Sequence, residues 1–490
     1  MNDKKINQGH SAELSKSLNM APRNPRHIHL MGICGTGMAS LAGILRKKGY
    51  DISGSDENIY PPMSLFLKDM EIPVLKGYKP ENLYPVPDLV IVGNVITKYN
   101  PEAIELSRLN IPYLSMPQAL KEYAMHGKKA IVIAGTHGKT TTSSLVSWLM
   151  EEAGRDPGFM IGGMPHNFNS GFRLGDGPYF IIEGDEYDTA FFDKGAKFLH
   201  YDPWITILTS IEFDHADIFN DLEQVVNAFR RLIDIIPHDG LLIANGDDPL
   251  VLAESKRAKC PVITYGLTAR NHWKATPHAF RDGCTHLEIT RDGESYMDLR
   301  TTLYGKYNIS NLLSAIALSD FLGLSKSDIH KASEGFKGVK RRQEIKGIKA
   351  GITVIDDFAH HPTAVNKTIT AVKERYGNHR LLAVFEPRSN SSRRRVFQDQ
   401  YAESFDMADM VFIPDPVMLE RIPADERFSS KKLVDALISR GKKAVYSPDT
   451  NHLLEEILER LRTGDVVLIM SNGSFDNIHE RLLERLETFS

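Results

Sequence analysis

The apolar segment KKAIVIAG, residues 128–135, limits the possible folds of this chain more than any other feature. It is short enough for one strand, and its glycine turn leads into TTSSLVSWLMEEAG, which has helical character. Strands that are apolar on both faces are typical of parallel sheets covered by helices on both sides. Similar runs alternate with helical segments along the rest of the chain, which predicts an α/β protein with mostly parallel sheets.

The 490 residues are too many for one hydrophobic core and suggest about three domains. We expect a mobile tail over 1–26, a doubly wound domain over 27–125, a central mononucleotide-binding domain of the phosphate-loop type over 126–338, and a third α/β domain over 339–490. In the central domain, THLEITRDGESYMDL alternates about Asp292 and Gly293. This pattern predicts an antiparallel hairpin beside the parallel sheet.

Composition narrows the possible functions. The formal charge of −4 supplies no basic field for wrapping nucleic acid. No apolar run is long enough to span a bilayer, and the first 26 residues lack the apolar core of a signal peptide. Cys34, Cys260 and Cys284 lie far apart, without the spacing of a disulfide framework or a cysteine zinc site. A reducing cytoplasm therefore fits the chain best.

The loop AGTHGKTTTS, residues 134–143, has the outline of a phosphate-binding loop, but two residues rather than four separate Gly135 from Gly138. Backbone amides and a helix start converge at such a turn and attract phosphate. Lys139 can neutralise charge on a terminal phosphate, and the Thr140 hydroxyl is placed to bind Mg²⁺. The short spacing argues against the standard phosphate-loop nucleotide hydrolases.

Acidic residues follow two further apolar strands. IIEGDEYD places Glu183 just beyond one strand, where a carboxylate can hold Mg²⁺ opposite the phosphate loop. IEFDHADIF places His215 after another strand. A second metal position at this histidine and a purely structural role have equal weight.

Three later motifs carry groups suited to a nucleotide. GKYNISN puts Asn308 and Asn311 on one helical face, where they can contact a base or ribose or simply cap the helix. VKRRQ offers Arg342 for a phosphate or carboxylate. DDFAHHP groups Asp357 with two histidines, and nucleotide or substrate contact is favoured there over a zinc site, because a third clear ligand is lacking.

The turn GICGTGMASLAG approximates a dinucleotide-binding fingerprint, with Asp56 at a suitable distance for a ribose. A nicotinamide-dependent oxidoreductase is therefore one hypothesis for the first domain. Ser40 replaces the last glycine of that fingerprint, which weakens it. The same turn can bind the diphosphate of any nucleotide conjugate.

Taken together, GTHGKTT, EGDE, EFDHADIF, GKYNISN, KRR and DDFAHHPT resemble the Mur ligase family in order and approximate spacing, over essentially the whole chain after the tail. The resemblance implies an ATP-dependent, amide-forming ligase of peptidoglycan metabolism. It also implies a UDP-binding first domain, a central ATP-binding domain and a Rossmann-like third domain, with ATP and Mg²⁺ as cofactors. Tyr307 stands where the family usually has a histidine.

The resemblance also implies roles for particular residues. Those with catalytic roles are Lys139, Glu183, His215, Arg342 and Asp357. Those that bind ATP are Gly135, Thr136, His137, Gly138, Lys139, Thr140, Thr141, Asn308, Asn311 and Arg342. Those that bind the UDP-sugar are Gly35, Thr36, Gly37, Asp56 and Asn94. Metal binding falls to Thr140, Glu183 and His215. Peptide contacts fall to Arg388, Asn390, Ser471 and Asn472, for which exposed strand-end turns are an equal alternative.

Two substrates follow from the resemblance. The first domain is most similar to family members that take UDP-N-acetylmuramic acid. The stretches IYPPM, DEYDTAFFDKGAKFLHY, FEPRSNSSRRR and MSNGSFDNIH favour the recycled tripeptide L-Ala-γ-D-Glu-meso-diaminopimelate as the amine. L-Alanine, as in de novo synthesis, is the alternative. A non-catalytic nucleotide-gated binding protein ranks lower, as does the oxidoreductase, and the oligomeric state is open.

Overall fold

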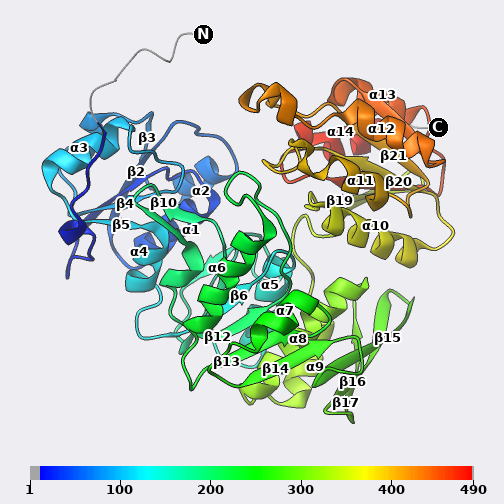
Figure 1. Cartoon of the computed structure of the whole chain (residues 1–490), viewed down its shortest axis with the longest axis horizontal. Coiled ribbons are helices and arrows are strands. Elements are labelled where there is room, and N and C mark those ends of the chain that lie inside the picture. Colours follow the sequence, from blue (N-terminus) through cyan, green and yellow to red (C-terminus); the bar gives the residue numbers. More distant parts are fainter. Residues whose placement is uncertain (1–10, 488–490) are drawn as a thin grey trace.

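The computed structural model describes residues 11–487, which form three α/β domains, each built on its own sheet (Figure 1). The first domain, in blue, and the third, in yellow to red, stand on either side of the view, and the central domain lies below and between them. The predicted fold class is confirmed. The limits drawn at residues 125 and 338 stay predictions.

The first domain has a five-stranded sheet in the order β3-β2-β1-β4-β5, and all of its strand pairs are parallel. This is the strand order of a doubly wound, nucleotide-binding open sheet. The binding crevice of such a sheet lies at the carboxyl ends of its strands. The strands are β1 (His27–Met31), β2 (Asp51–Asp56), β3 (Val74–Lys76), β4 (Leu89–Val92) and β5 (Tyr113–Ser115). The helices are α1 (Thr36–Lys47), α2 (Met63–Asp69), α3 (Pro101–Leu109) and α4 (Met116–Tyr123).

The N-terminal segment differs from the expected mobile tail over residues 1–26. Residues 1–10 lie outside the described part of the chain, whereas residues 11–26 lie against the first domain. The Asn19 side chain donates to Gln118 Oε1 at 3.1 Å, and the Gln118 amide donates back to Asn19 Oδ1 at 2.9 Å. The polar composition that suggested a tail supplies these hydrogen bonds instead.

The central domain has a ten-stranded sheet in the order β17-β16-β15-β14-β13-β12-β6-β9-β7-β8. Its middle strands run parallel, and antiparallel pairs close both ends. The strands are β6 (Lys129–Ala134), β7 (Gly158–Met160), β8 (Phe172–Arg173), β9 (Tyr179–Gly184), β12 (Pro203–Leu208), β13 (Leu241–Asn245), β14 (Val262–Gly266), β15 (Trp273–Arg281), β16 (Cys284–Arg291) and β17 (Glu294–Thr301). The helices are α5 (Lys139–Glu152), α6 (Leu222–Asp234), α7 (Pro249–Ser255), α8 (Lys306–Phe321) and α9 (Lys326–Gly335).

Antiparallel hairpins also belong to this central domain. The predicted one is β16–β17, where Arg291 pairs with Glu294 and both turn residues between them have positive φ, as a tight two-residue turn requires. The sequence did not predict β15–β16, which turns between Arg281 and Cys284, or β10 (Asp188–Ala190) with β11 (Asp193–Ala196). At the β10–β11 turn the ring of Phe192 meets Tyr113 of the first domain edge to face, with centroids 4.9 Å apart. This contact joins the first two domains.

The third domain has a six-stranded sheet in the order β18-β19-β23-β20-β21-β22, parallel except for the edge strand β18. The strands are β18 (Glu344–Lys349), β19 (Ile352–Asp357), β20 (Leu381–Phe385), β21 (Met410–Pro414), β22 (Lys443–Ser447) and β23 (Val466–Met470). The helices are α10 (Pro362–Tyr376), α11 (Gln398–Ser404), α12 (Ser430–Ser439), α13 (Thr450–Leu458) and α14 (Ile478–Leu486).

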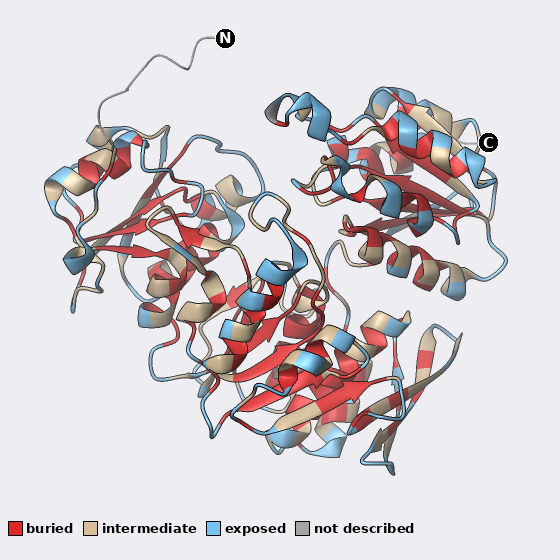
Figure 2. Ribbon diagram, viewed as in Figure 1, coloured by how far each residue is buried: buried red, intermediate tan, exposed pale blue. Residues whose placement is uncertain are grey.

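The hydrophobic cores lie along the sheets, and Figure 2 shows buried residues filling the strands of all three domains. Every residue of β19, β20 and β23 is buried, as expected for parallel strands with helices on both faces. Helix α8 packs against α5 and is buried on nearly every side. Within residues 11–487, no helix combines the length and the apolar character needed to cross a membrane.

The packing of the N-terminal segment can be tested by replacing Asn19 with alanine. We expect the hydrogen bonds to Gln118 to be lost and this segment to be destabilised locally by about 1 to 3 kcal/mol, because its partner groups are part-buried. Hydrogen exchange of the amides in residues 11–26 measures the change. Ser17→Ala is the control, since Ser17 Oγ bonds only to exposed Ser15, and equal exchange in both variants would contradict the assignment.

Candidate functional site

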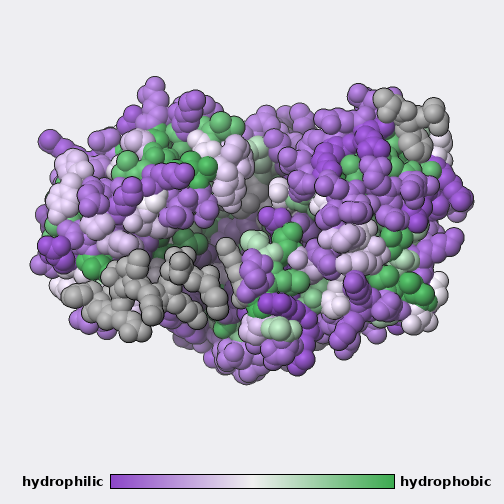
Figure 3. Space-filling view, turned by 90° about the horizontal axis from the view of Figure 1, so that it is seen from above, coloured by the Kyte–Doolittle hydropathy of each residue, from purple (hydrophilic) through white to green (hydrophobic). Residues whose placement is uncertain are grey.

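A cleft with a volume of about 1950 Å³ is lined by residues of all three domains, among them Thr36, Lys139 and Asp357. Figure 3, seen from above, shows the molecule hollowed between its two outer domains. Pockets for single drug-sized ligands measure roughly 300–1,000 Å³. The cleft can therefore hold two large ligands together.

The shortened loop is pressed between two other segments. Gly135 has a φ of 124°, and a Cβ atom there would lie 2.2 Å from Thr209 Oγ1. Gly138 has a φ of 85°, and a Cβ atom there would lie 2.6 Å from Asn311 Oδ1. Both positions therefore require glycine, for backbone conformation and for space.

The loop amides divide into two sets. The amide of Thr136 donates to the Ser210 carbonyl at 3.0 Å, and that of His137 donates to Ser210 Oγ at 3.0 Å. These two amides, which the sequence assigned to ATP, are thus already bonded within the protein. Within residues 11–487, the amides of residues 138–141 at the start of α5 donate to no other residue, which leaves them available to an anion at the helix start.

Lys139 lies in a buried chain of charges. Its Nζ donates to the Gly135 carbonyl at 2.6 Å and lies 3.0 Å from Glu186 Oε2, whose other oxygen is 3.1 Å from His215 Nε2. Burial lowers the pKa of Lys139, but the charges of Glu186 and Asp185 outweigh it and raise the pKa above its usual value. Burial lowers the pKa of His215, but the hydrogen bond to Glu186 and the charges of Asp214 and Glu186 together outweigh it and raise the pKa above its usual value.

Glu186 was part of the acidic stretch considered in the sequence but was not selected. The metal site expected from the sequence contains Glu183 and His215 and stays a prediction, whereas the carboxylate that contacts His215 in the structure is that of Glu186. The spacing along the sequence was the signal that could have indicated Glu186. This residue comes two positions after the end of β9, and its carboxylate contacts Lys139.

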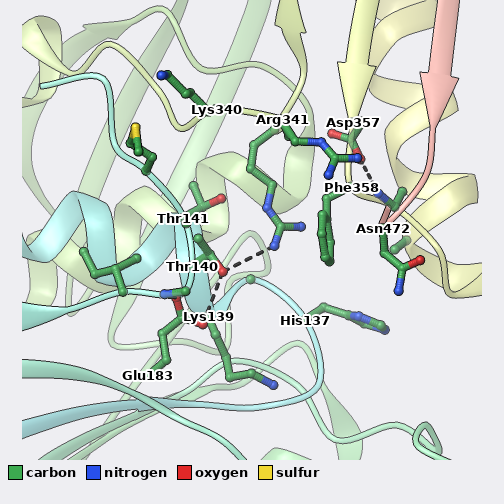
Figure 4. A pocket seen from close by; sticks show the side chains of 18 of the residues that line it. His137, Lys139, Thr140, Thr141, Glu183, Lys340, Arg341, Asp357, Phe358 and Asn472 are labelled. Carbon is green, nitrogen blue, oxygen red and sulfur yellow. Dashed lines mark hydrogen bonds between the residues drawn. The ribbon is translucent and has the colours of Figure 1, made fainter. Parts of the chain in front are cut away.

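Thr140 and Glu183 form the second half of the loop site (Figure 4). The Thr140 hydroxyl donates to Glu183 Oε2 at 3.2 Å. Arg342, at the start of the third domain, donates to the same hydroxyl at 3.3 Å. Burial raises the pKa of Glu183, although the Gly162 amide, at 2.7 Å, offsets part of the rise. A hydroxyl and a carboxylate side by side are the oxygen donors that Mg²⁺ prefers.

Arg342 reaches the loop from the third domain, and Asp357 lines the same cleft. The Arg342 guanidinium lies 4.8 Å from the ring centre of Phe358, which fixes its direction. Asp357 accepts from the amides of Gln343 and Ala359, both at 2.8 Å. Figure 4 shows Asp357 and Phe358 across the cleft from Lys139 and Thr140.

The two predicted asparagines both line the cleft, but they differ in contacts. Asn308 donates to the Tyr304 carbonyl at 3.1 Å and to Gln343 Oε1 at 2.8 Å. Its side-chain amide is therefore already hydrogen-bonded to the segment that leads into the third domain. Asn311 lies against Gly138 of the loop. Tyr307, in the family's histidine position, packs against the hydrophobic core of the third domain.

The predicted peptide contacts lie at the carboxyl ends of β20 and β23, which are neighbours in the sheet. Glu386, which the sequence did not single out, holds two of them. Arg388 Nη1 donates to Glu386 Oε1 at 3.2 Å, and Ser471 Oγ donates to Glu386 Oε2 at 2.5 Å. Asn390 instead donates to Asp217 of the central domain at 2.8 Å. Asn472 alone of the predicted four is part of the cleft lining.

The predicted UDP-sugar residues are more dispersed. Thr36 and Gly37, at the start of α1, line the cleft, whereas Gly35 is the residue that precedes the helix. Both oxygens of Asp56 accept backbone amides, from Cys34 and Asn58 at 2.9 Å each, so this carboxylate shapes the glycine turn. Asn94 is exposed at the end of β4.

The fold and the site define a three-domain nucleotide-binding protein with a shortened phosphate loop. Residues 27–128 match the Mur ligase family catalytic domain, residues 133–319 the Mur ligase middle domain, and residues 341–473 the Mur ligase glutamate ligase domain. The chain belongs to the Mur ligase family. The resemblance seen in the sequence is thereby confirmed.

Curated relatives extend over nearly the whole chain. The UDP-N-acetylmuramate–L-alanyl-γ-D-glutamyl-meso-2,6-diaminoheptandioate ligase of Haemophilus influenzae is 39% identical over 463 residues, 94% of this chain and 99% of that protein. A UDP-N-acetylmuramate–L-alanine ligase of Clostridium botulinum is 34% identical over 455 residues, 93% of this chain and 97% of that protein. Among solved structures, a murein peptide ligase from Psychrobacter arcticus is 33% identical with a TM-score of 0.71, covering 95% of this chain and 99% of that one.

The buried charge chain predicts a large effect of Glu186→Gln. Removing the carboxylate takes away the ion-pair partner of buried Lys139 and the hydrogen-bond partner of His215, and we expect the free energy of unfolding of the central domain to fall by about 3 to 5 kcal/mol. Denaturant titration followed by tryptophan fluorescence measures it. The three tryptophans all lie in the central domain, at positions 148, 204 and 273.

The matched control is Glu152→Gln in the same domain. Glu152 pairs with Lys331, whose side chain is 76% exposed, so this substitution removes a solvent-screened pair and should leave the titration nearly unchanged. Similar losses of stability in the two variants would refute a central role for the Glu186 carboxylate.

Proposed function

We propose that the chain is an ATP-dependent ligase that joins UDP-N-acetylmuramic acid to the tripeptide L-Ala-γ-D-Glu-meso-diaminopimelate in peptidoglycan recycling. The observation that carries the proposal is the 39% identity, over 94% of the chain, to a ligase named for these two substrates. The large cleft between three domains supports it, because the reaction needs a nucleotide, a nucleotide sugar and a peptide in one place. We further propose a cytoplasmic location, which fits three free cysteines.

ATP binds at the start of α5 in this proposal. The amides of residues 138–141 and the positive end of the helix receive the phosphates. Lys139 moves from Glu186 toward the terminal phosphate, and Arg342 approaches it from the third domain. Asn311, beside the loop, is the better placed of the two asparagines for the nucleotide, because the Asn308 amide is already bonded.

The residues present fit Mg²⁺. Thr140 and Glu183 supply hard oxygen donors side by side, and His215 with Glu186 offers a second position. The ion supplies charge neutralisation on the transferring phosphoryl group. Around it, Glu183 is oriented by the Gly162 amide, and the Thr140 hydroxyl is oriented by its contacts with Glu183 and Arg342.

The reaction proceeds in two displacements. A lactyl carboxylate oxygen of UDP-N-acetylmuramic acid attacks the γ-phosphorus, the bond to the β,γ-bridging oxygen breaks, and ADP leaves. The amine of the tripeptide's L-alanine then attacks the acyl carbon and loses a proton, and the tetrahedral intermediate expels inorganic phosphate. Lys139 and Arg342 stabilise the negative charge that develops on the transferring group.

Closure of the third domain protects the acyl phosphate from water. The contact of Arg342 with Thr140 and that of Asn390 with Asp217 both join the third and central domains. Asp357, anchored by two backbone amides, then lies at the ATP site. The cleft-facing start of α1, at Thr36 and Gly37, receives the diphosphate of the UDP-sugar.

Product analysis tests the proposal directly. The protein is incubated with ATP, Mg²⁺ and UDP-N-acetylmuramic acid, and either the tripeptide or L-alanine, and products are identified by mass spectrometry. We expect the UDP-muramoyl tripeptide, and no product from Lys139→Ala. Efficient product from L-alanine alone would assign the chain to de novo synthesis, the activity named for the Clostridium botulinum relative.

Arg388 tests the peptide assignment. In this proposal Arg388 exchanges Glu386 for a carboxylate of the tripeptide. In Arg388→Ala we expect the KM for the tripeptide to rise by about ten-fold or more, since that charge-assisted hydrogen bond is lost, with the KM for ATP unchanged. Arg440→Ala, which removes a 41% exposed arginine of the same domain, is the control. A parallel rise in the KM for ATP would show that Arg388 supports the domain rather than the peptide.

A further inference from the structure

Two histidines and a carboxylate meet where the third domain touches the phosphate loop. His137 belongs to the loop between β6 and α5, Glu212 follows β12, and His361 precedes α10 in the third domain. His137 Nε2 lies 3.3 Å from Glu212 Oε2, and His361 Nδ1 lies 3.8 Å from the same oxygen. One ligand atom from each residue lies within 4.8 Å of the other two.

We propose that His137, Glu212 and His361 form a binding site for a transition-metal cation such as Zn²⁺. The bound cation links the third domain to the phosphate loop. The proposed Mg²⁺ position uses other residues, Thr140 and Glu183. The assignment does not depend on the ligase activity, because it rests on the donor atoms alone.

The donor set suits zinc better than magnesium. Zinc binds imidazole nitrogen and carboxylate oxygen at about 2.0–2.2 Å, usually with tetrahedral geometry, which places ligand atoms roughly 3.3–3.6 Å apart. The two distances to the Glu212 oxygen are close to that spacing. Two histidines and one glutamate leave a fourth position open. Magnesium prefers oxygen donors and is a poor match for two imidazoles.

His361 is oriented for this role by its own surroundings. Its Nε2 lies 3.1 Å from the Phe213 carbonyl, which can only accept, so Nε2 carries the proton and Nδ1 presents its lone pair toward Glu212. A backbone carbonyl on the far nitrogen is a common way of fixing a histidine ligand. The Thr363 amide also approaches Nδ1, at 3.3 Å, and a metal would displace that longer bond.

The site has a mechanical consequence, because its ligands come from two domains. An ion bound to all three side chains stabilises only the arrangement in which His361 lies against the loop. Binding to one state draws the population toward it. A transition metal would therefore hold the third domain closed and slow any step that requires opening.

Cobalt and zinc titrations of the full-length protein, without nucleotide, test the site. We expect one tightly bound Co²⁺ with visible absorption of tetrahedral type and no thiolate charge-transfer band, displaced by Zn²⁺. Glu212→Gln and His361→Ala should each weaken binding by about 100-fold or more, because losing a direct ligand costs more than losing one of its hydrogen-bond partners.

Two controls keep the result interpretable. His215→Ala removes a histidine of the other candidate metal position and should retain the tight Co²⁺ site. Far-UV circular dichroism checks that each variant is folded, because the tryptophans lie in the central domain and His361 lies in the third. Glu212→Gln keeps the side-chain volume nearly unchanged. Loss of the tight site in His215→Ala but not in His361→Ala, or the absence of any tight site in the wild type, would overturn the proposal.

Discussion

The geometry of the site depends on one constraint: parallel strands that share a sheet end at the same edge. Lys139 follows β6, Glu183 lies at the end of β9, Glu186 follows β9, and His215 follows β12. These three strands are neighbours in the central sheet. The third domain repeats the arrangement with β19, β20 and β23. Because each crossover helix returns the chain to the opposite edge, groups that are far apart in sequence converge without any long functional loop.

This constraint also explains what the sequence could predict. The fold class, the phosphate loop and Glu183 each follow from a local pattern, namely an apolar strand and the residues at its end. Glu386 and Ser471 are 85 residues apart, and their hydrogen bond exists only because β20 lies beside β23. Strand order is a tertiary property, so no local pattern could select Glu386.

The other differences have equally physical causes. Residues 11–26 are polar and were taken for a tail, yet their hydrogen bonds to the first domain depend on groups about a hundred positions later. Thr136 and His137 were assigned to ATP, but their backbone amides donate to Ser210. No pattern in the sequence distinguishes that serine. Local composition cannot show which donors a distant segment will satisfy.

The buried charged groups have partners before any substrate arrives. Glu186 contacts both Lys139 and His215, and Lys197 lies 2.6 Å from Asp185. An incoming phosphate therefore exchanges one anionic partner of Lys139 for another. The gain in binding is a difference between two strong interactions, which is how a deeply charged site can remain stable when empty and still release its product.

The bonds from Ser210 to the loop and the contact of Gly138 with Asn311 leave the shortened turn no freedom to rearrange. A longer phosphate loop wraps around its ligand, whereas this one is braced from both sides. A flexible loop loses conformational entropy when it binds its ligand, whereas this loop has already lost that entropy on folding. Nucleotide recognition thus costs little conformational entropy at this end of the cleft.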